Sequence, residues 1–121
     1  MEDTDMENAI EAKSFRFAVR VVRLCRHLRE NKKEYILTKQ LLRSGTSIGA
    51  NVVEAQQAQS RADFISKLSI ALKEAVETDY WIRLLKEAGY LTETESSSIY
   101  SDCKELEKLL TSIVKTSRTE N

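Results

Sequence analysis

The chain contains 121 residues, which suits one domain whose hydrophobic core needs no metal or disulfide. Proline is absent and glycine occurs three times, so the composition favours long helices and argues against a sheet-rich fold. The formal net charge is zero, but residues 13–43 hold ten bases and two acids, whereas residues 1–12 hold five acids and no base. Basic surface is therefore concentrated in the first third of the chain.

The sequence contains no apolar run of about 18 residues, the length that a membrane-spanning helix requires. Its N-terminus is acidic, where a secretory signal would be basic and then apolar. Cys25 and Cys103 each lie on an apolar helical stripe, so we expect two buried thiols in a reducing compartment. These features predict a cytoplasmic protein without a membrane segment.

The first predicted helix covers residues 8–31, after a flexible acidic N-terminal tail over residues 1–7. We expect a single domain over residues 8–117. The apolar positions at helical spacing in this helix are Ile10, Phe15, Ala18, Val19, Val22, Cys25 and Leu28. Basic residues occupy much of the remaining surface and the end of the helix: Arg16, Arg20, Arg23, Arg26, Arg29, Lys32 and Lys33.

The second predicted helix has Thr38 as its N-cap and ends near Gln57. It contains Gly45 and Gly49, each of which costs roughly 1 kcal/mol of helix propensity relative to alanine. Small and apolar residues nevertheless recur every three or four positions, so we predict a continuous helix whose glycines let a neighbouring helix approach closely. The alternative is a Ser-Gly-Thr-Ser loop that joins two shorter helices.

Ser60, with Asp63 three residues on, predicts a third helix from about Arg61. Gly89 predicts its end in a left-handed cap. This helix is apolar on two sides, which places it centrally or at a subunit contact. Thr92 and Glu95 form a capping box for a fourth helix that runs to about Lys115. The pattern predicts an all-α, up-down-up-down four-helix bundle.

Three segments then suggest a family: residues 43–55 (RSGTSIGANVVEA), 63–75 (DFISKLSIALKEA) and 77–85 (ETDYWIRLL). They resemble the bacterial four-helix-bundle proteins encoded by intervening sequences of 23S ribosomal RNA genes, also called the S23 ribosomal protein family. The likeness covers residues 14 to 115. It implies a homopentamer with no established enzymatic activity. The related accessory proteins of diversity-generating retroelements bind nucleic acid and a reverse transcriptase through basic surface.

The basic residues of the first helix and the turn after it are the candidate binding surface. Arginines at three-residue and four-residue steps can meet several phosphates of RNA or DNA at once and release their counterions. Such contacts would follow backbone and shape more than base sequence. One alternative is a solvated face paired with acids of the fourth helix such as Glu105 and Glu107. Another is a protein-interaction scaffold, such as a reverse-transcriptase-type accessory partner, without direct nucleic-acid binding.

A second polar group lies beside core positions of the middle helices. We expect it to form a structural hydrogen-bonded network, completed by Arg43 or another base, and the alternative is an active site. Its members are Ser44, Ser47, Asn51, Glu54, Glu74 and Glu77. His27 is the single histidine, so the two Glu-x-x-His motifs of a di-iron bundle cannot be formed. We therefore expect no enzyme, no cofactor and no metal.

Overall fold

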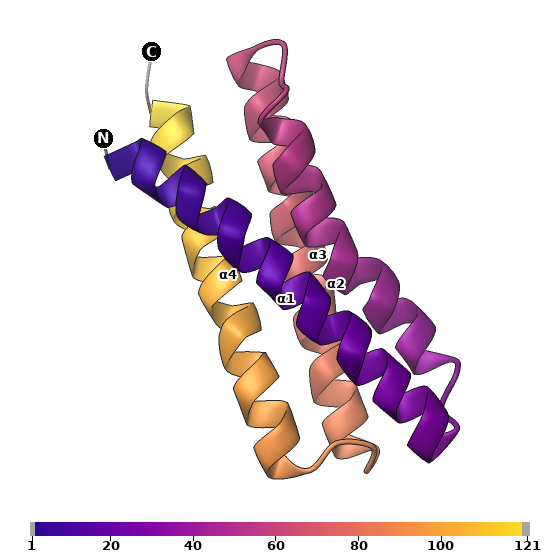
Figure 1. Cartoon of the computed structure of the whole chain (residues 1–121). Helices are drawn as coiled ribbons and strands as arrows, with labels where there is room; N and C mark the ends of the chain where they lie inside the picture. The colour runs from indigo at the N-terminus through magenta and orange to yellow at the C-terminus, as the bar shows by residue number, and fades with distance from the viewer. Residues whose placement is uncertain (1, 120–121) are drawn as a thin grey trace.

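Four helices account for almost all of residues 2–119, the part that the computed structural model describes, with side chains described from residue 5. They are α1 (Glu2–Lys32), α2 (Leu37–Ala55), α3 (Arg61–Glu87) and α4 (Glu93–Thr119). Each helix packs against the next, and α4 returns to α1, as Figure 1 shows. The predicted all-α four-helix bundle is confirmed. None of the described helices is long and apolar enough to cross a membrane.

Helix α1 begins at Glu2, so the predicted helix start at Asn8 is wrong. The helix extends over most of the acidic segment because negative charge is favourable near a helix N-terminus. Met6 also lies one turn before Ile10 and packs against the core, which extends the buried stripe. Met1 lies outside the described residues.

The buried side of α1 differs from the predicted stripe. Phe15 and Val22 are 69% and 39% exposed, whereas Phe17 and Val21 are buried. Both sets of apolar residues have helical spacing, so the sequence pattern alone did not decide between them. The contact with α2 decides which residues are buried, because Val21 lies directly over Gly45.

Helix α2 is continuous through both glycines, and the alternative of a loop between two short helices is wrong. The predicted N-cap is also wrong: Thr38 lies inside the first turn, and its side chain does not cap the helix. Helix α2 ends at Ala55, two residues before the predicted Gln57, because the next N–H groups turn back to Val53 and Glu54.

The predicted ends of α3 and the start of α4 are confirmed. Ser60 Oγ accepts a hydrogen bond from the Asp63 N–H at 3.1 Å. Gly89 has a φ of +89°, and the Tyr90 N–H beyond it donates to the Leu85 carbonyl at 2.9 Å, which closes a Schellman motif. The Thr92 and Glu95 capping box forms both reciprocal hydrogen bonds. Helix α4 continues to Thr119, past the predicted Lys115.

The two cysteines are free thiols in the core, as expected. Burial raises the pKa of Cys25 to about 11. Burial also raises the pKa of Cys103, whose Sγ contacts the Ala75 carbonyl at 3.3 Å. Both therefore stay protonated at neutral pH and act as small apolar side chains.

Candidate nucleic-acid interface

The arginines of α1 form a diagonal row across the outer face of the bundle. From Arg20 on they follow every third residue, and on an α-helix each such step turns by about 60° around the axis. At one end, Arg20 reaches α4, where its guanidinium contacts Asp102 and Ser98. At the other end, Arg29 reaches the start of α2 and donates to Thr38 Oγ1 at 3.1 Å. The row therefore crosses α1 from the α4 side to the α2 side.

Three other arginines of α1 are open to solvent. Arg16, Arg23 and Arg26 are exposed, and none of them takes part in an ion pair within residues 5–119. Arg16 and Arg23 are two helical turns apart, about 10 Å along the axis. A rigid helix thus presents three guanidinium groups whose donors are free for an external anion.

The fourth helix supplies fewer partners than the solvated-face interpretation requires. Glu105 pairs with Lys13 at 3.0 Å, outside the predicted row. Glu107 faces α3 and pairs with Lys104 of its own helix at 3.4 Å. The acid that does meet the row is Asp102, which sequence reasoning missed because nothing in the pattern showed which face of α4 would turn toward α1.

The basic surface continues into the turn between α1 and α2. Lys32 and Lys33 are exposed there, and so is Lys39 in the first turn of α2, which was not predicted. Two apolar side chains accompany them: Tyr35 is 57% exposed and Ile36 is 77% exposed. The sequence predicted Lys32 and Lys33 as part of the candidate surface, but no pattern singled out the aromatic residue beside them.

Glu34 holds this turn in place and is itself buried. Its carboxylate accepts hydrogen bonds from the N–H groups of Ile36, Leu37 and Thr38 at 3.1, 3.0 and 2.8 Å. Burial opposes ionisation of Glu34, but the hydrogen bonds to the backbone outweigh it and lower its pKa. Glu34 is therefore the N-terminal cap that the sequence analysis assigned to Thr38.

The six residues of the predicted polar network lie along the contact between α2 and α3, in separate groups. Arg43 bridges Glu74 and Glu77, and Glu77 also accepts a hydrogen bond from Trp81 Nε1 at 2.9 Å. Three smaller pairs are Ser44 with Thr78, Ser47 with Asn51, and Glu54 with Lys67. The contacts of Arg43, Ser44 and Glu54 tie α2 to α3, whereas Ser47 and Asn51 pair within α2.

A cluster of charged residues that was not predicted lies between α3 and α4. Asp79 is buried and contacts Arg83 Nε at 2.8 Å and Lys104 Nζ at 3.2 Å. Glu107 lies beside it: burial raises its pKa, and the hydrogen bond and negative charge of Asp79 add to the effect. For Asp79 burial acts in the same direction, but hydrogen bonds from Glu107, Arg83 and Lys104 prevail and lower its pKa. When the pair holds one proton, that proton lies on Glu107.

This assignment predicts how Glu107→Gln changes the pH dependence of stability. Because the pKa of Glu107 is raised in the folded state, its stabilising contribution is complete below its ordinary value of 4.5 and is lost as the pH rises through the higher folded value. Glutamine cannot lose that proton. We expect the variant to gain stability relative to wild type as the pH rises above 4.5, as measured by urea denaturation at several pH values. The exposed Glu105→Gln should show no such gain, and an equal gain there would contradict the assignment.

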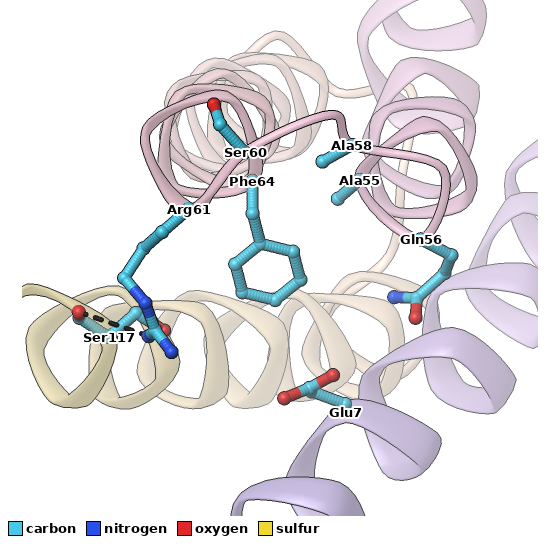
Figure 2. Close-up of a pocket in the computed structure, with 8 residues that line it drawn as sticks. All are labelled: Glu7, Ala55, Gln56, Ala58, Ser60, Arg61, Phe64 and Ser117. Carbon is cyan, nitrogen blue, oxygen red and sulfur yellow. Dashed lines mark hydrogen bonds between the residues drawn. The ribbon is translucent and has the colours of Figure 1, made fainter. Parts of the chain in front are cut away.

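A pocket of about 380 Å³ lies at the end of the bundle where α2 meets α3. Figure 2 shows its lining side chains, which come from all four helices and the connection between α2 and α3. Arg61 Nη1 donates to the Ser117 carbonyl at 3.4 Å, which joins α3 to α4. Among the described residues, no group of three or more His, Cys, Asp or Glu side chains is arranged to hold a metal ion.

Comparison with known proteins decides the family. A family model described as "23S rRNA-intervening sequence protein" matches residues 6–112. The chain belongs to this family. The chain is also similar to a protein of known structure from Bacteroides thetaiotaomicron VPI-5482, which is described as a protein with unknown function from the S23 ribosomal protein family. It is 55% identical to this chain, with a TM-score of 0.90, and the match covers 91% of this chain and 98% of that one. The search of curated proteins gave no match.

Proposed function

We propose that this member of the 23S rRNA-intervening sequence protein family is a non-enzymatic protein that binds the phosphate backbone of RNA or DNA through the outer face of α1. The observation that carries the proposal is the set of exposed arginines without ion pairs: Arg16, Arg23 and Arg26. Lys32 and Lys33 extend the same surface at the end of the helix. Each phosphate that such a group neutralises releases condensed counterions.

The surface suits phosphates better than base edges. No Phe, Tyr or Trp lies between Arg20 and Arg29 on α1, and the single ring there is His27, so the arginines are not interleaved with large stacking side chains. Local charge favours the same ligand, because residues 13–43 carry a net charge of +8 while the whole chain is neutral. Binding to this face should follow the shape and charge of the backbone.

Replacing the three arginines tests the proposal. We expect Arg16→Gln with Arg23→Gln and Arg26→Gln to weaken binding to a fluorescent structured RNA. The slope of log affinity against log salt should fall by about 2 to 3, because each phosphate contact contributes roughly 0.7 to 0.9. Fluorescence anisotropy at several salt concentrations measures both quantities.

The matched control removes the same charge elsewhere. Lys73, Lys108 and Lys115 are exposed on α3 and α4, and their replacement by glutamine should leave the salt slope close to wild type. Equal losses in the two triple variants would mean that net charge, and not the α1 face, governs binding. Absence of binding by wild type at low salt would exclude the proposed function.

A second candidate is a homo-oligomeric scaffold that acts through protein contacts in the cytoplasm. It is favoured by apolar side chains that stay exposed on three helices: Phe15 and Val22 on α1, Val53 on α2, and Val76 and Tyr80 on α3. Burial of such side chains between subunits or partners would be favourable. The family resemblance suggests a pentamer, and light scattering would give the subunit number from the 13.9 kDa chain mass.

A further inference from the structure

The turn between α1 and α2 presents an aromatic side chain beside several bases. Tyr35 and Ile36 follow each other in sequence, and both are more than half exposed. Among the described residues, the Tyr35 ring has no aromatic or cationic partner, unlike Tyr80 and Tyr100. One face of an aromatic ring is therefore available to a ligand.

This exposure is imposed by the backbone. Glu34 accepts three N–H groups of the turn, its own N–H donates to the Leu28 carbonyl at 3.3 Å, and its carbonyl accepts from Thr38 Oγ1 at 2.9 Å. Lys33 takes a φ of +56°, a left-handed conformation unusual for a residue other than glycine. The hydrogen bonds of the turn fix the backbone on which Tyr35 is carried, so a ligand that contacts the ring does not have to order the loop.

Charge identifies the class of ligand. The diagonal arginine row runs toward the α2 side of α1 and ends with Arg29, whose guanidinium already contacts the start of α2. Lys32, Lys33 and Lys39 are exposed around the turn. The arginine row can bind phosphates, and the aromatic ring beyond its end can stack on a base. Together they match a nucleic acid that has an unpaired base next to the phosphates bound by α1.

We propose that Tyr35 is a stacking platform for an unpaired base of a single-stranded or looped nucleic acid, with Lys32 and Lys33 holding the adjacent phosphates. This inference rests on the proposed function and adds a preference for unpaired segments. Ile36 extends the apolar surface beside the ring. Stacking on an aromatic ring tolerates any base, so the subsite selects strand state and not sequence.

The test uses the full chain and a single-stranded RNA of about 12 nucleotides that carries one 2-aminopurine, together with its blunt duplex. Wild type should bind the single strand and quench its fluorescence. Tyr35→Ala should weaken that binding by roughly 5- to 150-fold and remove the quenching, while duplex affinity stays unchanged. Tyr35→Phe keeps the ring and should behave as wild type, and Tyr80→Ala is the control for loss of another exposed tyrosine. Circular dichroism checks that each variant is folded.

The outcomes separate the two proposals. If Tyr35→Ala leaves single-strand affinity and quenching unchanged while the arginine triple variant loses binding, the stacking platform is wrong and the proposed function stands. If wild type binds neither RNA at low salt, both are wrong. If Tyr35→Ala lowers binding to vesicles that contain phosphatidylserine but not to RNA, the turn is a lipid contact and the platform is again wrong.

Discussion

Replacing Glu34 by alanine is expected to lower the free energy of unfolding by about 3 kcal/mol, because the variant loses a charged N-terminal cap. Three N–H groups of the first turn of α2 donate to this carboxylate, and Thr38 among them is fully buried. Without the carboxylate, the N–H of Thr38 faces a buried site with no acceptor, and the N–H groups of Ile36 and Leu37 lose their acceptor at a part-buried site. Urea denaturation followed by circular dichroism measures the loss.

Glu30 provides the matched control, because it is an exposed glutamate four residues earlier, in the last turn of α1. Glu30→Ala removes the same charge and should cost well under 1 kcal/mol. The pH dependence gives a second check. Since the pKa of Glu34 is lowered in the folded state, its contribution is complete above its ordinary value of 4.5 and is lost as the pH falls through the lower folded value. Glu34→Gln should remove that acid-induced loss, and an unchanged pH profile would contradict the capping role.

Gly45→Ala and Gly49→Ala are expected to change stability in opposite directions. A Cβ at residue 45 would lie 2.8 Å from Val21 Cγ2 and 2.9 Å from Val21 Cγ1, and a β-branched side chain in a helix has no other good rotamer to adopt. Overpacking of about 1 to 3 kcal/mol should exceed the gain of about 1 kcal/mol in helix propensity. At residue 49 the nearest atom is the Ser14 carbonyl oxygen at 3.4 Å, so Gly49→Ala should gain up to about 1 kcal/mol.

A double-mutant cycle locates the cause of the loss. In a Val21→Ala background the two Cγ methyl groups are absent and the remaining Cβ lies at 3.2 Å, so Gly45→Ala should there cost clearly less stability than in wild type. A loss of the same size in both backgrounds would mean that Val21 does not set the requirement for glycine. Thermal unfolding of the four proteins completes the cycle.

Much of the fold could be predicted because its signals are local. Ser60, Gly89 and the pair of Thr92 and Glu95 act within a few residues of their own positions, so their helix ends could be predicted correctly. The rotation of α1 depends on a distant contact. Phe15 and Phe17 fit equally good helical stripes, and only packing of α1 on α2 decides which one is buried.

The start of α2 could not be predicted correctly, for a different reason. Thr38 is a preferred capping residue and precedes an apolar run, so propensity favours it. A glutamate four residues earlier performs the task through a left-handed residue at Lys33, a geometry for which the sequence offers no sign. For the candidate site, the basic residues were evident but their pairing was not. Whether Arg20 or Arg23 meets an acid depends on where Asp102 of α4 faces.

The two cysteines lie on the first and last helices, Cys25 on α1 and Cys103 on α4, and each sulfur is enclosed by the core. An alkylating reagent needs an accessible thiolate, which neither site supplies while the helices stay together. The rate at which each sulfur is alkylated therefore reports how often its helix separates from the rest of the bundle. Unequal labelling rates would identify which helix of the bundle separates first, without introducing a new cysteine.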